Sequence, residues 1–341
     1  MSARGLIQTF ESWRLTGEPM VLATVYDTAG STYSKAGHRI LIASNADYQG
    51  LVSGGCLEGD LAERARAVLE VNEPAAVTYD MRDDADDLWG LGVGCNGLIR
   101  VFLQPLIAES GYEPFARIAQ GLLSSDPVIV ATVIAGETGD LPPGATLVWD
   151  GGDVENKALR RLLLGCQAAR ESGRAAFGTE EDGLAVLYAP LQPVPRILVL
   201  GAGLDALPVV NMAAELGWRV TIADHRPAYL EQGVFASAER AQLIDPARMT
   251  QELDPDDYDA IIVMSHHLIT DQTYLEQLAG TGVGYLGVLG PRARRDRLLD
   301  ALGPTGDVLR DRLQGPVGID IGAKDPESIA LSLLAEIHAT A

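Results

Sequence analysis

Cysteine is scarce in this chain of 341 residues, which holds only three, and long hydrophobic runs are absent. Three scattered cysteines cannot form a disulfide framework, and no Cys/His cluster has the spacing of a zinc site. Because no stretch of about 18 apolar residues occurs, we expect no membrane span. The N-terminus has neither the basic segment nor the apolar stretch of a signal peptide. These absences predict a soluble, cytoplasmic protein.

Positive charge is also sparse, since 26 Lys and Arg residues stand against 47 Asp and Glu residues and the net charge is −21. A surface this acidic repels phosphate backbones, so we do not expect nucleic acid as a partner. Anionic membrane surfaces are disfavoured for the same reason. Hydrophobic residues nevertheless make up 47% of the chain, which is enough to fill well-packed cores and excludes a disordered chain.

The order of the predicted elements indicates an α/β protein with two folded domains, the number expected at this length. Residues 1–106 combine apolar runs, Gly-rich loops and an amphipathic helix at 57–70, which predicts an N-terminal α+β domain with a mixed sheet. Residues 107–195 are interpreted as a middle segment and linker. Over residues 196–341 strands and helices alternate, which predicts a C-terminal Rossmann-like domain with a parallel sheet.

Local signals also predict the bounds of individual elements. The short apolar run at residues 51–52 is interpreted as a strand, and residues 156–172 have the pattern of one long helix. The last helix is expected to begin at Pro326 with Asp325 as its N-cap. Proline favours the first helical position, and a carboxylate accepts hydrogen bonds from the free amides of a helix start.

A dinucleotide-type fingerprint, G-x-G-x-x-A, begins at Gly201 between an apolar strand and a helix. The first glycine forms the turn, and the second, Gly203, lets the backbone approach a phosphate. Asp224 ends the next strand, where an acidic side chain binds a ribose hydroxyl. Arg226 is either a phosphate contact or a surface side chain. The pattern predicts a Rossmann fold with a phosphate-bearing ligand, and turn glycines that serve packing alone are the alternative.

Further polar residues follow later strands, at the sheet edge that faces the ligand crevice. His266 and His267 come after an apolar strand. Adjacent side chains of an extended chain point to opposite sides, so at most one of them is expected to face the site. Asp271 lies at a predicted helix start and is interpreted as a cap. The arginines at 292–295 are either an anion contact, notable in so acidic a chain, or a solvated helix face.

Glycine-rich loops that contain a cysteine distinguish the first domain. One such loop lies directly before the predicted helix and consists of Ser53, Gly54, Gly55 and Cys56. Its glycines let amides turn toward an anion, and the start of a helix stabilises a thiolate. Glu58, in the first helical turn, suits the helix dipole.

A second loop of this kind, at residues 92–97, contains Cys95. Two cysteines flanked by glycines in one domain indicate a binding site. In contrast, Cys166 lies in an apolar helix and is interpreted as a core residue. A third small-residue loop, at 30–32, is followed by basic residues up to Arg39 and is a candidate for further anion contacts.

Together these motifs resemble those of the XdhC/CoxI family, the accessory proteins of molybdenum hydroxylases such as xanthine dehydrogenase and carbon monoxide dehydrogenase. The resemblance leaves only the middle segment unmatched. The matching stretches are AGSTYSKAGHRILI, GLVSGGCLEGDLAERA, GLGVGCNGLIRVFLQPL, ILVLGAGLDALPVVNMAAELGWRVTIADHRP, VMSHHLITDQTYLEQL, YLGVLGPRARR and PVGIDIGAKDPESIALSLLAEI. The segments SGGCLE and PVGIDIGAKDPESIALS are much more specific than the nucleotide fingerprint.

The resemblance implies a protein that binds molybdenum cofactor, as molybdopterin or its dinucleotide form. It would protect the cofactor while its terminal sulfur is installed and deliver it to a hydroxylase apo-enzyme. Such a chaperone need not be an enzyme. The resemblance implies that Cys56 contacts the cofactor or its sulfur, with Cys95 as the second candidate. A cysteine desulfurase is a further candidate partner, and we expect a homodimer.

Two other functions would use the same residues differently. An NAD(P)-dependent oxidoreductase would hold its dinucleotide with Gly201, Gly203 and Asp224. It would use His266 or His267 as acid or base. A pure assembly adaptor would bind a hydroxylase through its acidic surface without any small-molecule site. Both alternatives leave the glycine–cysteine loops without a role, so a molybdenum cofactor chaperone is the favoured function.

Overall fold

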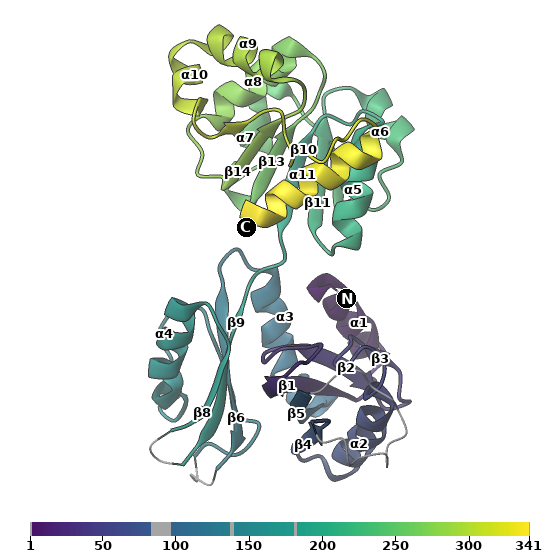
Figure 1. The fold of residues 1–341 in the computed structure, drawn as a ribbon, viewed down its shortest axis with the longest axis vertical. Helices are drawn as coiled ribbons and strands as arrows, with labels where there is room; N and C mark the ends of the chain where they lie inside the picture. The colour runs from purple at the N-terminus through teal and green to yellow at the C-terminus, as the bar shows by residue number, and fades with distance from the viewer. Residues whose placement is uncertain (1, 83–96, 137–139, 181–182, 341) are drawn as a thin grey trace. The chain divides into compact units, whose positions relative to one another are not determined.

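The computed structural model describes residues 2–82, 97–136, 140–180 and 183–340. The chain divides into two compact units, Met1–Pro193 (unit 1) and Val194–Ala341 (unit 2). Among these residues, unit 1 contains two sheets and unit 2 contains one (Figure 1). Among the described residues no helix is long and apolar enough to cross a membrane.

The first sheet of unit 1 is antiparallel, with the strand order β3-β2-β1-β5-β4. Its strands are β1 (Met20–Gly30), β2 (Arg39–Ala43), β3 (Tyr48–Gln49), β4 (Ala75–Asp80) and β5 (Gly97–Leu106). Helix α2 (Glu58–Val71) covers one face, because Leu61, Ala65 and Val68 recur at helical spacing and pack into the core of the sheet.

The strand expected at residues 51–52 is not formed. Val52 is buried in the core beneath α2 but belongs to a loop. Its amide donates to the carboxylate of Glu58 rather than to a neighbouring strand. The carboxylate of Glu58 therefore accepts the hydrogen bond that a neighbouring strand would have accepted.

The second sheet of unit 1 is also antiparallel, with the order β7-β6-β9-β8. Its strands are β6 (Val128–Ala135), β7 (Thr146–Trp149), β8 (Ala176–Thr179) and β9 (Ala185–Leu191). Helix α4 (Leu163–Ser172) packs on it through Cys166 and Ala169. The helix predicted at 156–172 is shorter than expected, because Leu159–Leu162 form a 3-10 turn before α4 begins.

The two sheets of unit 1 pack against each other. Tyr26 and Phe102 of the first sheet share an apolar cluster with Leu187 and Ala189 of the second. Residues from 1–106 and from 107–195 therefore contribute to one core. Two further α-helices of the unit are α1 (Ala3–Leu15) and α3 (Phe115–Leu123), which meet where the ring of Phe10 packs edge-on against that of Phe115.

Unit 2 is built on a parallel sheet with the order β12-β11-β10-β13-β14-β15, which confirms the predicted Rossmann-like fold class. Its strands are β10 (Arg196–Leu200), β11 (Arg219–Asp224), β12 (Arg240–Leu243), β13 (Ala260–Val263), β14 (Tyr285–Val288) and β15 (Leu313–Gln314). The strand order reverses between β10 and β13. Ligands of open α/β sheets bind at such a switch point, beyond the carboxyl ends of the strands.

Helices cover both faces of this sheet, which explains why its central strands are apolar throughout. They are α5 (Ala206–Glu215), α6 (Pro227–Gly233), α7 (Met249–Glu252), α8 (Leu268–Leu278), α9 (Arg292–Leu302), α10 (Pro304–Leu309) and α11 (Pro326–Thr340). The predicted start of α11 is confirmed, since the carboxylate of Asp325 accepts from the Ser328 amide at 2.8 Å and Pro326 is the first helical residue.

Candidate functional site

The cysteine loop, residues 53–56, leads into α2 and is organised by the carboxylate of Glu58. Oε1 of Glu58 accepts from the amides of Val52 (2.7 Å) and Ser53 (2.9 Å). Oε2 accepts from the amide of Gly55 (2.9 Å) and from the Ser53 hydroxyl (2.8 Å). Four donors on one carboxylate hold the loop in a single conformation, because hydrogen bonds to a charged acceptor are the strong ones.

Glu58 is buried, with only 1% of its surface exposed. Burial by itself raises the pKa of its carboxyl group, but the hydrogen bonds from Ser53 and Val52 outweigh that effect and leave the pKa below its ordinary value. The Ser53 hydroxyl oxygen also accepts from the amide of Leu57 at 2.7 Å, which links the carboxylate to the start of α2. Glu58 therefore holds the cysteine loop through hydrogen bonds, whereas the sequence suggested only a favourable interaction with the helix dipole.

The loop presents Cys56 to solvent directly before α2. Gly54 and Gly55 have φ angles of +80° and +115°, which side chains with a Cβ rarely adopt. A Cβ at Gly55 would meet no atom within 4 Å, so backbone conformation and not space requires glycine there. Cys56 is free and exposed, whereas Cys166 is buried, and burial raises the pKa of the Cys166 thiol to about 12. Only Cys56 of these two is accessible as a nucleophile or soft ligand.

The small-residue loop between β1 and β2 flanks the cysteine loop. A Cβ at Gly54 would lie 3.8 Å from the ring of Tyr33, and the Ser34 hydroxyl donates to the carbonyl of Leu51 at 3.2 Å. Tyr33 and Cys56 are both exposed. Cys95, the second predicted contact, lies outside the described residues.

In unit 2 the fingerprint turn lies at the switch point between β10 and β13. Gly201 has a φ of +127°, and a Cβ there would lie 2.5 Å from the carbonyl carbon of Met264. The first glycine is thus required by close contact with the backbone after β13. At Gly203 a Cβ would lie 2.5 Å from a carboxylate oxygen of Asp205 and 3.7 Å from the ring of His266. The side chains of Asp205 and His266 therefore lie close to the second glycine.

Asp205 and His266 form an ion pair beside this turn. The imidazole Nε2 of His266 lies 2.7 Å from Oδ2 of Asp205. The hydrogen bond with Asp205 raises the pKa of His266 and outweighs the opposite effect of burial. Because Asp205 is the N-cap residue of α5, its negative charge lies where a fingerprint turn would receive a phosphate. A phosphate at Gly203 would have to displace or neutralise this carboxylate.

Asp224 is fully buried, and its carboxylate is saturated by donors from its own chain. It accepts from the Ala202 amide at 2.7 Å, and from the amide (2.9 Å), Nε (2.9 Å) and Nη2 (2.8 Å) of Arg226. Burial raises the pKa of this carboxyl group, but the bonds from Arg226 and Ala202 leave it below its ordinary value. In this conformation Asp224 ties the fingerprint turn to β11, and Arg226 is its partner and not a free phosphate contact.

Asp271 does not cap α8 as the sequence suggested. Its Oδ1 accepts from the amide and the hydroxyl of Ser265, and its Oδ2 lies 2.6 Å from Nη2 of Arg294. The N-cap is His267, whose Nδ1 accepts from the amide of Thr270. His266 and His267 have separate partners, Asp205 and Thr270. Contrary to expectation, the chain is not extended here, because His266 has a φ of +59°. The buried Asp271 carboxylate fixes the segment between β13 and α8.

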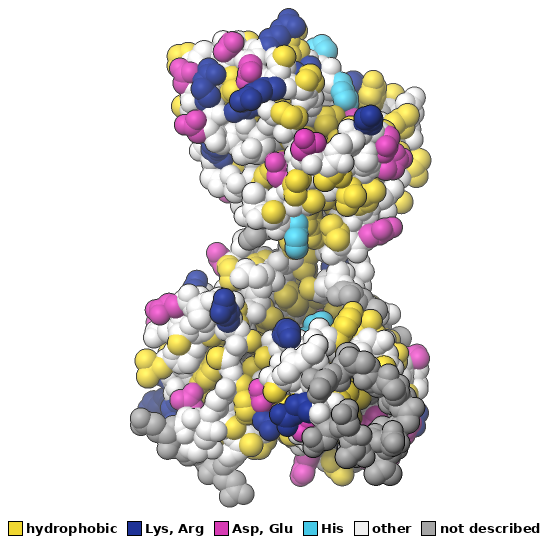
Figure 2. Space-filling view, viewed as in Figure 1, with side chains coloured by type: hydrophobic (Ala, Val, Ile, Leu, Met, Phe, Trp, Pro, Cys, Tyr) yellow, Lys and Arg dark blue, Asp and Glu magenta, His cyan; other side chains and the backbone are white. Residues whose placement is uncertain are grey.

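The arginines at 292–295 do not form one anion-binding patch. Arg294 pairs with Asp271, and Arg295 donates to the carbonyl groups of Leu313 and Arg310. On the face of unit 2 drawn in Figure 2, Lys and Arg side chains are interspersed with Asp and Glu. Arg294 and Arg295 therefore interact with other groups of this chain.

The predicted site residues thus form two groups. One group in unit 1 consists of the cysteine loop, with Ser53, Gly54, Gly55 and Cys56, and of Glu58 at the start of α2, which binds it. The other group, Gly201, Gly203, Asp224 and His266, lies at one sheet edge of unit 2. Sequence reasoning missed Asp205, and it missed the pairing of Arg294 with Asp271. An acidic residue within the fingerprint turn was the available signal for Asp205, whereas nothing in the sequence links Arg294 to Asp271.

The chain thus combines a Rossmann-like unit with a preceding unit of two antiparallel sheets and an exposed cysteine. The family model described as "XdhC Rossmann domain" matches residues 197–337, and that of the "XdhC and CoxI family" matches residues 13–80. The chain belongs to the XdhC and CoxI family, which confirms the resemblance seen in its motifs.

Individual relatives agree with this membership over nearly the whole chain. A Bacillus subtilis protein described as a probable subunit of xanthine dehydrogenase is 32% identical, and the match covers 95% of this chain and 93% of that protein. The Escherichia coli "Molybdenum cofactor insertion chaperone PaoD" is 22% identical over 95% of this chain and 84% of its own. A crystal structure of a Bacillus halodurans protein described as a xanthine dehydrogenase has a TM-score of 0.78 at 29% identity, and the match covers 100% of this chain and 96% of that one.

Proposed function

We propose that this protein is an accessory factor of a molybdenum hydroxylase of the xanthine dehydrogenase or carbon monoxide dehydrogenase type. It binds molybdenum cofactor as cargo, protects it and inserts it into the apo-enzyme. Membership of the XdhC and CoxI family supports the accessory role. The names of the two relatives, one tied to xanthine dehydrogenase and the other to cofactor insertion, point in the same direction.

The exposed thiol of Cys56 on a preorganised loop is the observation that carries this proposal. A cysteine thiolate is a nucleophile and a soft ligand, which suits contact with a metal centre that carries sulfur ligands. Because Glu58 already fixes the loop through four hydrogen bonds, little ordering entropy is lost when cargo binds. We assign to Cys56 the contact with the cofactor or its sulfur, and to Glu58 a positioning role.

The fingerprint turn of unit 2 is the secondary candidate contact. Asp205 places a negative charge beside Gly203, and Asp224 is saturated by Arg226 and Ala202. Neither arrangement favours the NAD(P)-dependent alternative, which would require an open turn and a carboxylate free to bind ribose. Binding of the cofactor's phosphate at Gly203 would need the Asp205–His266 pair to open.

The partner of this chaperone is the apo form of a molybdenum hydroxylase. Contact with a cysteine desulfurase and assembly as a homodimer remain expectations from the family resemblance. Co-purification of the tagged full chain with the hydroxylase, followed by size-exclusion chromatography with light scattering, would test both the partner and the oligomeric state.

The direct test is an anaerobic binding titration of the full chain with molybdenum cofactor, followed through the fluorescence of the oxidised pterin. We expect binding near one cofactor per chain, weakened at least tenfold in Cys56→Ala and unchanged in Cys166→Ala, which removes the buried thiol instead. A known carrier serves as positive control. No saturable binding by the wild-type chain, or equal losses in the two variants, would overturn the proposal.

A further inference from the structure

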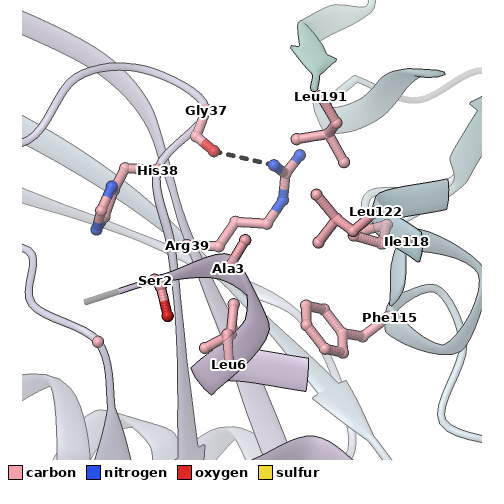
Figure 3. A pocket seen from close by; sticks show the side chains of 11 residues that line it. Ser2, Ala3, Leu6, Gly37, His38, Arg39, Phe115, Ile118, Leu122 and Leu191 are labelled. Atoms are coloured by element: carbon pink, nitrogen blue, oxygen red, sulfur yellow. Dashed lines mark hydrogen bonds between the residues drawn. The ribbon is translucent and has the colours of Figure 1, made fainter. Parts of the chain in front are cut away.

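A cavity of about 210 Å³ lies within unit 1 beside the start of α1. Its wall is mostly apolar, formed by Leu6 of α1, Phe115, Ile118 and Leu122 of α3, and Leu191 of β9. One cationic side chain, Arg39 of β2, extends between these groups (Figure 3). No residue of this cavity belongs to the cysteine loop.

The guanidinium of Arg39 lacks a complete set of partners. The residue is only 9% exposed. Its Nη1 donates to the carbonyl oxygen of Gly37 at 2.9 Å, but its Nη2 is buried and has no hydrogen-bond partner. Among the described residues no carboxylate pairs with Arg39. Burial lowers the pKa of Arg39 to about 10, so the side chain stays charged at neutral pH.

An unpaired buried charge calls for an explanation. Buried guanidinium groups are normally paired, because the solvation lost on burial is recovered only through an opposite charge and well-formed hydrogen bonds. The two N–H groups of Nη2 are the donors that lack an acceptor here. Ser2, the N-cap of α1, and Ala3, its first residue, also line the cavity. The positive end of the α1 dipole therefore adds to the preference for a negative group.

We propose that this cavity binds a small organic anion, namely a monocarboxylate with an apolar body of about the size of a benzene ring. An apolar protein cavity of about 150 Å³ accommodates benzene, so the observed volume leaves room for a ring together with a carboxylate. The carboxylate pairs with Nη2 of Arg39 once the guanidinium turns this buried nitrogen toward the cavity, since a guanidinium fork matches carboxylate geometry. The apolar body contacts Phe115, Ile118 and Leu122. This site is independent of the proposed cofactor function.

The charge of the ligand should determine its affinity. A carboxylate supplies the missing partner of Nη2, whereas a neutral alcohol of the same shape leaves the charge unpaired. A hydrogen bond to a charged group contributes enough to change affinity about tenfold or more. Shape contributes less, because aromatic and short aliphatic bodies both fit an apolar wall. We therefore expect benzoate and hexanoate to bind and benzyl alcohol to bind far more weakly.

Isothermal titration calorimetry of the full chain with benzoate, hexanoate and benzyl alcohol tests this proposal. We expect benzoate to bind with a Kd of about 1 mM or tighter, a reasonable affinity for so small a ligand. We expect benzyl alcohol to bind at least tenfold more weakly. Absence of saturable binding by both carboxylates, or equal affinity for benzoate and benzyl alcohol, would overturn it.

Two variants locate the binding at this cavity. Arg39→Met keeps an unbranched stem but removes the guanidinium and its charge, and benzoate affinity should fall at least tenfold. Ala3→Trp places an indole at an exposed lining position and should block entry without altering the core, so it stays informative even if Arg39→Met fails to fold. Gln8→Trp, on the exposed side of α1 and away from the cavity, should leave binding unchanged. Undiminished benzoate binding in Ala3→Trp would overturn the assignment.

Discussion

The imidazole of His266 lies 2.7 Å from the carboxylate of Asp205, although the two residues are separated by 61 positions in the chain. The contact joins the segment after β13 to the start of α5, at the switch point of the parallel sheet. A charged pair beside Gly203 makes the fingerprint turn of this protein different from an open dinucleotide turn. It also makes the turn sensitive to pH.

Asp205→Asn should lower the pKa of His266 toward its ordinary value, because the hydrogen bond with Asp205 is the largest cause of the upward shift. A raised folded-state pKa stabilises the fold fully below the unfolded pKa, about 6.5, and this contribution is lost as pH rises through the folded pKa. The stability difference between wild type and variant should therefore be larger at pH 6 than at pH 9. The side chain of His266 is 57% exposed, so the difference should stay below about 1 kcal/mol.

NMR titration of the imidazole signal, assigned with a His266→Gln variant, measures this pKa. Asp307→Asn, which changes an exposed carboxylate on α10, is the matched control and should leave the His266 titration unchanged. An identical His266 pKa in wild type and Asp205→Asn would show that the pair does not form in solution.

Glu58→Gln should lower the free energy of unfolding by about 3 kcal/mol, because a buried carboxylate with four donors is replaced by an amide that cannot accept from all of them. The pKa of Glu58 is depressed in the folded state. Its stabilising contribution is therefore present above the unfolded pKa, about 4.3, and is lost as pH falls through the folded pKa. The deficit of the variant should shrink in acid.

Urea denaturation at pH 7 and pH 4 measures both effects. Glu63→Gln, at an exposed position of the same helix that pairs with Arg66, should cost less than about 1 kcal/mol. Should the two substitutions prove equally mild, the carboxylate of Glu58 would not be the element that holds the cysteine loop.

Asp224→Asn should destabilise the protein by about 3 kcal/mol or more, because Asp224 is fully buried and pairs with Arg226. A ribose-binding carboxylate at a strand end would instead be exposed, and its loss would affect ligand binding with little effect on the fold. Thermal unfolding distinguishes these cases, with Asp205→Asn as the comparison at the same sheet edge. An unchanged melting temperature for Asp224→Asn would mean that its carboxylate is free.

Much of unit 2 could be predicted from its sequence. The strand that precedes Gly201 and the helix that Asp325 caps depend on local patterns, namely an uninterrupted apolar run and a capping residue followed by proline. The predicted positions of Gly201, Gly203 and His266 at one sheet edge follow from the same rule, since parallel strands end on the same side.

The partners of the buried carboxylates could not be predicted in this way. Glu58 accepts from Val52, and this contact turns an apparent strand into a loop. Asp271 pairs with Arg294, which lies 23 residues further along the chain. Such contacts depend on where tertiary packing brings side chains together, and no residue spacing encodes them. For the same reason, the unpaired Arg39 is visible only once its surroundings are known.

The two glycines of the fingerprint should respond differently to substitution. Gly201→Ala combines a φ of +127° with a Cβ that would lie 2.5 Å from the backbone of Met264. Backbone atoms cannot move aside cheaply, so this variant should lose about 3 kcal/mol or more of stability. Gly203→Ala meets only the carboxylate oxygen of Asp205 within 3 Å, and a side-chain rotation relieves that contact at a cost below about 1 kcal/mol.

Gly203→Ala should nevertheless lower the pKa of His266, because rotation of the Asp205 carboxylate weakens the hydrogen bond that raises it. Thermal unfolding of both variants and NMR titration of His266 in Gly203→Ala would test this pair of expectations. Equal stability losses would mean that both glycines are required by packing. A stable Gly203→Ala variant with an unchanged His266 pKa would mean that Asp205 does not lie against Gly203, and that the turn is open to a phosphate after all.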